Sequence, residues 1–217
     1  MPLQNRVNPF GQIIESAGRG TIMGNRGVIH RDKKIVRNFK TKHWITCSIH
    51  YKNARRTMMT NNRWTELFFL DEATAFSAGH RPCAYCRNKD FKLFKKLWIE
   101  ANADSYNLTD FAISKIDDIL HQERMSEKGE KRTYKSALKH LPDAVMVQTD
   151  DSDQCYLYCN HFLLKWSEHG YTEMMKADGN KVVTVLTPKS MVNVFKLGYS
   201  CDIHPGAKLL LANGNEQ

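Results

Sequence analysis

The spacing of apolar and polar residues predicts a chain that mixes short strands with amphipathic helices. Short apolar or alternating runs predict strands at 34–36, 43–49, 56–59, 144–147, 155–159 and 181–186. Helical spacing, acidic first turns and glycine stops predict helices at 71–78, 89–101, 109–127 and after Thr187-Pro188. The Gly- and Arg-rich residues 1–31 and the charged residues 126–136 are expected to form loops. The predicted fold is α+β, with mixed or antiparallel strands and three to four helices around a zinc-binding module.

Length and composition favour one domain over residues 1–217, with a subdivision possible near residue 140. The first residues contain no apolar signal segment, and the chain has no run of 18 apolar residues. We therefore expect a cytoplasmic protein with no membrane partner. In a reducing compartment the six cysteines are expected to be metal ligands or core thiols rather than disulfides.

Positive charge is concentrated in one part of the chain. The net charge is +9, but the segment from Arg19 to Arg63 holds twelve Lys or Arg and one acid, a net charge of +11. The rest of the chain therefore sums to −2. Such a concentrated positive field favours a protein that binds a polyanion, most simply DNA with RNA as the alternative. The other possibility is a basic protein that has no such partner.

Cys83 and Cys86 are separated by two residues and follow a proline. A Cys-x-x-Cys turn lets two thiolates converge on one zinc ion, while two further ligands come from elsewhere. The nearest candidates are His43 and Cys47, which would face the same side of a strand. A surface histidine and a buried strand thiol are the alternatives for these two residues. Four protein ligands would close the site, so the zinc would be structural.

Two other roles are open to the cysteine pair. A redox pair of the thioredoxin type follows a strand and begins a helix, whereas a predicted helix ending at Gly79 comes before Cys83. A nucleobase deaminase combines Pro-Cys-x-x-Cys with His-x-Glu upstream. His50 lies at a plausible place for that histidine, but position 52 is Lys52 instead of the proton-shuttling glutamate. A zinc site therefore remains the favoured interpretation.

The segment Phe69-Leu70-Asp71-Glu72-Ala73, followed by Gly79-His80-Arg81-Pro82-Cys83-Ala84-Tyr85-Cys86, resembles the metal-binding module of Ada-type DNA repair proteins. The resemblance covers about residues 43–87 and implies a zinc ion and DNA as partner. The whole chain is also similar to a group of bacterial proteins that share Gly-Asn-Arg-Gly-x-x-His near the start and Leu-Thr-Pro near the end. That second likeness implies no activity.

Polar residues on the predicted helix 109–127 form a candidate reaction site. Asp117, His121 and Arg124 share one helix face at spacings of four and three residues. Asp117 could orient His121 as a general acid or base. An ordinary helix surface with an ion pair is the alternative.

The Gly-rich stretch Met23–His30 is the second candidate cluster. Glycines on both sides of Asn25 and Arg26 would let the backbone approach a phosphate or a base. Arg26 could bind a phosphate through two hydrogen bonds, and Asn25 could position a water. A Gly-rich turn without a ligand is the alternative.

The function predicted from these features is a zinc-stabilised hydrolase acting on DNA, a glycosylase more readily than a nuclease, in repair or phage defence. Its predicted catalytic residues are Asp117, His121 and Asn25. The alternative is a non-catalytic zinc-containing protein that binds nucleic acid as a regulator or adaptor. The residues expected to contact nucleic acid are Arg19, Arg26, His30, Arg55, Arg56, Arg81, Arg87 and Arg124.

Overall fold

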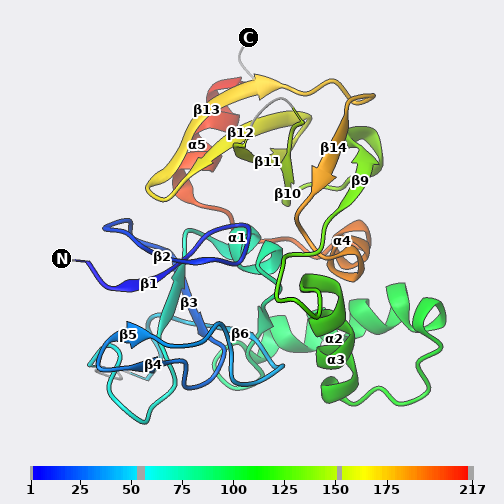
Figure 1. Ribbon diagram of the computed structural model, residues 1–217. Helices are drawn as coiled ribbons and strands as arrows, with labels where there is room; N and C mark the ends of the chain where they lie inside the picture. Colours follow the sequence, from blue (N-terminus) through cyan, green and yellow to red (C-terminus); the bar gives the residue numbers. More distant parts are fainter. Residues whose placement is uncertain (1, 53–56, 151–152, 215–217) are drawn as a thin grey trace.

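The computed structural model describes residues 2–52, 57–150 and 153–214 and has an α+β architecture. Two six-stranded sheets lie at opposite ends of the molecule in Figure 1, with helices between and beside them. The predicted fold class is confirmed, although the described residues form five α-helices instead of three or four. They contain no helix both long and apolar enough to cross a bilayer.

The first sheet is mixed and built from very short strands. Its order is β2 (Ile13–Glu15), β1 (Gln4–Val7), β7 (Leu67–Phe69), β3 (Ile22–Asn25), β6 (Ile45–Cys47) and β8 (Arg81–Pro82). The pairs β1–β7 and β6–β8 are parallel, and the other pairs are antiparallel. The prediction of loops throughout residues 1–31 is therefore wrong. A Cβ on Gly24 would lie 2.2 Å from the Ile45 carbonyl oxygen, so this glycine serves the close approach of a neighbouring strand.

A separate two-stranded hairpin projects from this end of the molecule (Figure 1). It pairs β4 (His30–Arg31) with β5 (Lys34–Ile35), and the predicted strand at 34–36 is confirmed. Both turn residues, Asp32 and Lys33, have positive φ, 49° and 61°. That backbone is the one a two-residue hairpin turn requires, because it follows the right-handed twist of the strands.

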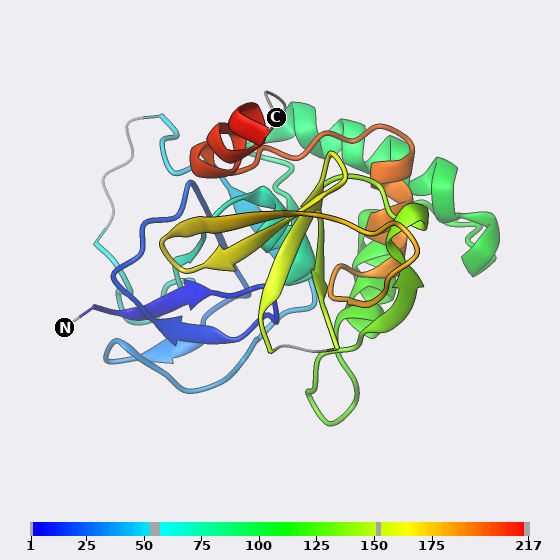
Figure 2. The same ribbon diagram turned by 90° about the horizontal axis from the view of Figure 1, so that it is seen from above.

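The second sheet is wholly antiparallel. Its order is β13 (Gly170–Lys176), β12 (Phe162–Ser167), β11 (Cys155–Cys159), β10 (Val145–Gln148), β14 (Val182–Val185) and β9 (Tyr134–Ala137). Three of these strands match the strands predicted beyond Pro142. Strands β9, β12 and β13 were not predicted, because their alternation is interrupted by lysines and glutamates on exposed faces. α5 (Pro205–Gly214) packs beside β13 (Figure 2).

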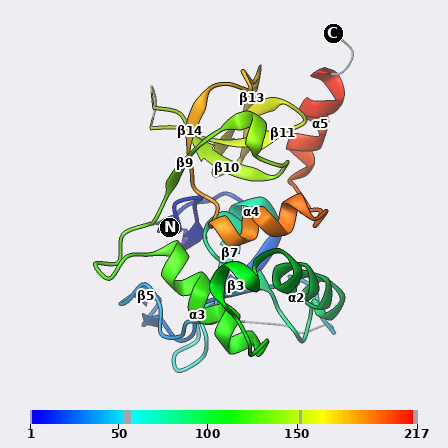
Figure 3. The ribbon, with the colours of Figure 1, turned by 90° about the vertical axis from the view of Figure 1, so that its right-hand side faces the viewer.

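The remaining helices lie between and beside the two sheets. α1 (Glu72–Ser77) is buried throughout and is capped by Asp71, whose Oδ1 accepts the Thr74 amide at 2.9 Å. Three helices lie together on one side of the molecule (Figure 3), namely α2 (Asn88–Asn102), α3 (Ile113–Arg124) and α4 (Lys189–Lys196). The 3₁₀ turn η1 (Asp104–Tyr106) follows α2, and the 3₁₀ turn η2 (Leu138–His140) follows β9. One apolar core runs from the second sheet through these helices. The division of the chain into one or more domains stays a prediction.

Candidate metal centre and basic surfaces

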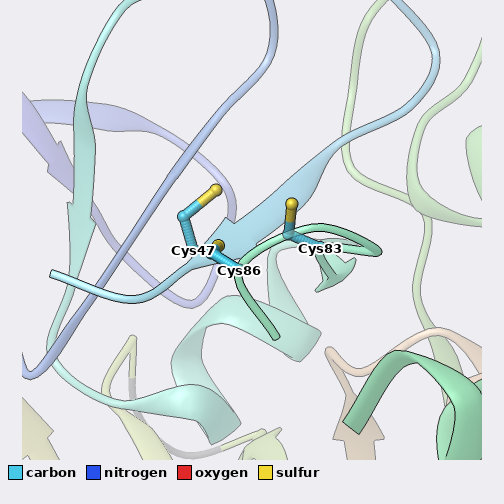
Figure 4. A group of neighbouring side chains, drawn as sticks. All are labelled: Cys47, Cys83 and Cys86. Carbon is cyan, nitrogen blue, oxygen red and sulfur yellow. The ribbon is translucent and has the colours of Figure 1, made fainter. Parts of the chain in front are cut away.

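Three cysteines converge at the edge of the first sheet. Cys47 ends β6, and Cys83 and Cys86 lie on the turn that leads from β8 to α2 (Figure 4). The parallel pairing of β6 with β8 aligns Thr46 with Pro82, which brings Cys83 beside Cys47. All three sulfur atoms lie within 4.8 Å of one another. Sulfurs at about 2.3 Å from a tetrahedral zinc are about 3.8 Å apart, so the group is compact enough to hold a metal ion.

The protein environment of the sulfurs suits thiolate ligands. The amide of Tyr85 donates to Cys83 Sγ at 3.4 Å, as amides commonly do to a metal-bound thiolate. A hydrogen bond from Cys47, followed by backbone amides, lowers the pKa of the Cys83 thiol to about 5. The same contact with Cys83 and then burial raise the pKa of Cys47. Three thiols this close cannot all ionise alone, but a divalent cation would remove that repulsion.

The three sulfur donors of the cluster restrict the kinds of metal ion that it can bind. Thiolates favour zinc, copper(I) or iron–sulfur chemistry over magnesium or calcium. An apolar shell of Met23, Ile45, Trp64 and Phe68 packs around the group. The residues present therefore fit a thiolate-bound metal, although they do not identify the element.

The predicted fourth ligand, His43, does not join the group. Its side chain is exposed, and its ring nitrogens are not among the clustered ligand atoms. An extended chain separates residues four apart by about 13 Å, too far to bind one ion, and β6 begins only at Ile45, so His43 does not share its strand face with Cys47. The prediction that His43 completes the site with Cys47 is wrong for this reason. Three protein ligands remain among the described residues, and the undescribed residues 53–56 have the sequence NARR, without a Cys, His, Asp or Glu.

The predicted Asp117–His121 pair is not formed. Asp117 instead receives two hydrogen bonds from Arg81, each 2.7 Å long, and both side chains are buried. His121 faces Arg124, with 2.8 Å between its Nδ1 and Arg124 Nη2. Burial, Arg124 and Lys42 lower the pKa of His121 to about 4. Helix spacing put the two residues on one face, but the Arg81 guanidinium from another element is the stronger partner for the carboxylate.

Asn25, the third predicted catalytic residue, shapes its own turn. Its Oδ1 accepts the Gly27 amide at 3.2 Å, and the side chain is half-buried at the end of β3. This is the local hydrogen bond that asparagine commonly makes in turns. It accounts for the residue without a substrate or a positioned water.

Four of the eight residues predicted to touch nucleic acid are buried, and three of these four are arginines. Arg26, Arg81 and Arg124 are 1%, 5% and 3% exposed. Arg87 is half-buried and forms ion pairs with Glu72 and Asp90 at 2.6 and 2.8 Å. None of these four arginine side chains is presented to a duplex surface. The prediction is wrong for them because net charge along a sequence does not distinguish buried from solvated cations.

The remaining residues predicted to contact nucleic acid differ in their exposure to solvent. Arg19 is exposed, as a phosphate contact requires. His30 is buried, and its Nδ1 lies 2.6 Å from the Thr65 hydroxyl. Its prediction as a surface contact is therefore wrong as well. Arg55 and Arg56 lie outside the described residues.

An exposed group of cations was missed. Five side chains on and after the β4–β5 hairpin are solvated, namely Arg31, Lys33, Lys34, Arg37 and Lys40. A surface cavity of about 450 Å³ lies among several of them, beside Asn61 and Asn62. The cluster of cations from 31 to 40 is visible in the sequence, but Asp32-Lys33 is not a typical hairpin turn pair, so the hairpin itself was not indicated.

Comparisons of the chain with family models, with curated proteins and with solved structures found no match.

Proposed function

We propose that the protein binds nucleic acid through the β4–β5 hairpin, and that a zinc ion held by Cys47, Cys83 and Cys86 stabilises the sheet behind it. The single observation that carries the proposal is the group of five solvated cations on 31–40. Lysines and arginines spaced along an exposed ribbon fit the phosphates of a nucleic-acid backbone. This is the alternative function predicted from the sequence.

The cations of the hairpin are not neutralised by nearby acids. Asp32, the one acid in this segment, is held by Asn61, whose Nδ2 donates to Asp32 Oδ1 at 2.6 Å. The Asp32 amide in turn donates to Asn61 Oδ1 at 2.8 Å. Within the described part of the chain, none of the five cations forms an ion pair. Their charge is therefore available to an external polyanion.

The metal centre would support the hairpin through the first sheet. Cys47 ends β6, which pairs with β3 just before Gly27, and the Gly27 carbonyl accepts the Thr65 amide at 3.0 Å. The Thr65 hydroxyl accepts the Ile29 amide and contacts His30, the first residue of β4. A metal that stabilises β6 against β3 would thus limit the movement of the hairpin that follows β3. Zinc is proposed because thiolates prefer it and because the Cys83–Cys86 segment resembles an Ada-type module.

Hydrolysis of DNA stays a prediction without a reaction centre in support. The structure pairs Asp117 with Arg81 and lowers the pKa of His121 through burial and neighbouring cations. A neutral histidine beside an arginine lacks the carboxylate that would orient it. Binding without chemistry is the function that the geometry favours.

The proposal is tested by reversing two charges on the hairpin. Lys33→Glu with Lys34→Glu should weaken binding to a short duplex by at least about tenfold and reduce the slope of log affinity against log salt by about 2. The matched control is Lys92→Glu with Lys96→Glu on α2, which makes the same change in net charge at two exposed positions. Fluorescence anisotropy with labelled DNA and RNA measures the affinity and its salt dependence for the two double variants.

Equal losses in the two double variants would show that only net charge matters, and would contradict the hairpin as the interface. The same incubations should be examined for nicks and abasic sites. Their appearance with wild type, and their loss in His121→Ala with binding retained, would restore the hydrolase prediction.

A further inference from the structure

A second cationic site lies beneath the surface, away from the metal ligands. A cavity of about 460 Å³ is lined by Gly11, Arg26, Trp44, Arg124 and Lys131, among others, and by none of the three clustered cysteines. It brings together residues 10–13, the residue that follows β3, the segment before β6, the end of α3 and the loop before β9. Three long cations thus meet in one hollow.

Two of these cations pack on one indole. The guanidinium carbons of Arg26 and Arg124 lie 3.8 and 3.9 Å from the centre of the Trp44 ring. The Trp44 ring is itself fixed by a 2.9 Å hydrogen bond from its Nε1 to the Thr41 carbonyl. Stacking on the indole holds the planar guanidiniums in place while leaving their edges free to donate.

The donors of this site are only partly used. Arg26 Nε donates to His80 Nε2 at 3.2 Å, but Arg26 Nη2 is buried without a hydrogen-bond partner. Arg124 donates through both Nη atoms to the carbonyls of Gly79 and Lys42, while its buried Nε has no partner. Lys131 Nζ donates to the Ser77 carbonyl at 2.6 Å and has two further protons. Buried donors left unpaired are costly, and a ligand would satisfy them.

The positive charge is also uncompensated. Within the described residues Arg26, Arg124 and Lys131 have no carboxylate in contact, and the nearby Asp117 is engaged by Arg81. Glu130 lines the mouth of the cavity and is exposed. Burial and the neighbouring cations lower the pKa of Arg26, and they lower that of Lys131 to about 7. The pKa of Arg124 falls to about 9, chiefly because it is buried.

We propose that this cavity binds the phosphoryl group of a phosphate monoester, held by Arg26 Nη2, Arg124 Nε and Lys131 Nζ. Three cations carried by three separate segments suit the several oxygens and the double charge of a phosphoryl dianion better than a monoanionic carboxylate. Gly11 has φ +82°, and a Cβ there would lie 3.8 Å from Arg26 Nη2, so the glycine keeps space open beside the free nitrogen. The cavity is larger than one phosphate group and has room for part of the molecule that carries it.

This inference is independent of nucleic-acid binding by the hairpin. Arg26, at 1% exposure, cannot reach the backbone of an intact duplex, whereas a terminal or small-molecule phosphate can enter the cavity. Failure of either proposal therefore leaves the other standing. Variants of the cavity should retain duplex affinity, and variants of the hairpin should retain the phosphate response.

Thermal unfolding and calorimetry with defined probes test the site. Inorganic phosphate and 5′-AMP should each raise the melting temperature of wild-type protein, and adenosine and acetate should not. Tenfold tighter binding of 5′-AMP than of inorganic phosphate would identify a phosphate carried by a nucleotide. Equal affinity would identify the free anion, and either result supports the proposed phosphoryl site.

Three substitutions localise the response. Arg26→Met and Lys131→Met should each weaken phosphate binding at least tenfold, whereas Lys128→Met, at an exposed position in the same loop, should leave it unchanged. Without phosphate, Arg26→Met should be at least as stable as wild type, because it removes an uncompensated buried cation. No stabilisation of wild type by either phosphate probe, or an equal response in all three variants, would overturn the proposal.

Discussion

The two sheets place cysteines in different settings and give them different chemistry. In the first sheet, Cys83 and Cys86 lie on a turn and meet Cys47 from a neighbouring strand. In the second sheet, Cys155 and Cys159 lie four residues apart on β11, a separation of about 13 Å along an extended strand. Both of these thiols are buried, and burial raises their pKa to about 12 and 11. Cysteines form a metal site when they meet from different elements of the fold, and their spacing along a single strand is not enough.

Individual polar side chains beside the two sheets also differ in whether their hydrogen-bonding atoms are satisfied. Next to the second sheet, the Tyr171 hydroxyl donates to Asp71 at 2.9 Å, and Glu123 accepts from the Ser190 amide at 3.0 Å. Near the first sheet, Arg26 keeps a buried donor without a partner. Paired groups specify a fold, whereas unpaired buried cations point to a ligand.

Removing one thiol from each sheet should separate their roles most clearly. Cys83→Ala should abolish stoichiometric metal binding and lower the free energy of unfolding by several kcal/mol, because a bound metal stabilises only the folded chain. Cys155→Ala makes the same change in a core strand and should cost about 1–2 kcal/mol while leaving the metal in place. Chemical denaturation and elemental analysis measure the two effects. Equal stability losses with equal metal content would remove the distinction between the sheets.

Two adjacent carboxylates on α3 provide the next test. Asp117 is buried with Arg81, and Asp118 forms an exposed ion pair with Lys42 at 2.7 Å. Asp117→Asn should cost about 3–5 kcal/mol of unfolding free energy, since it leaves a buried guanidinium without its counter-charge. Asp118→Asn should cost less than about 1 kcal/mol. A small effect of Asp117→Asn would mean that the carboxylate is not held by Arg81 and would reopen its predicted role beside His121.

The affinity of the cavity for an anion should also depend on pH, although only modestly. Sulfate is a suitable probe because it stays a dianion throughout the range. Since the pKa of Lys131 is lowered to about 7, its positive charge is lost as the pH rises through that value. Sulfate affinity should therefore fall several-fold between about pH 6 and pH 8.5, and calorimetry should show no such fall in Lys131→Met.

The pKa values of two neighbouring groups, Arg124 and His80, are also shifted. The charged or titratable side chains around the Lys131 cavity are Arg26, Arg124, His80 and Glu130. The lowered pKa of Arg124, about 9, lies above the tested range, and burial lowers that of His80 well below 6.5. An unchanged pH dependence in Lys131→Met would assign the titration to one of these groups instead.

Part of this fold could be predicted from its sequence. The helix α2 and the strand β11 followed from strong periodicity, and Cys47, Cys83 and Cys86 were predicted to meet. The strands of residues 1–25 were not predicted, because they are three or four residues long and depend on neighbours far along the chain. His43 was wrongly included because a predicted shared strand face was taken as sharing a metal.

The buried arginines were the largest error in the predicted site. Arg81 and Arg124 were read as surface cations, but tertiary packing gives each of them buried acceptors. No local pattern reveals this, since an arginine that pairs inside the fold looks the same in sequence as one in solvent. The Arg26 cavity likewise depends on residues more than a hundred positions apart.

Metal binding by three cysteine sulfurs at the edge of the first sheet is the claim that sets this sheet apart from the other. X-ray absorption spectroscopy at the zinc edge, combined with elemental analysis of protein purified under reducing conditions, would detect the ion and its ligands. We predict one zinc per chain with three sulfur neighbours at about 2.3 Å. Protein that is folded but free of metal, with all six thiols reactive once denatured, would contradict the claim.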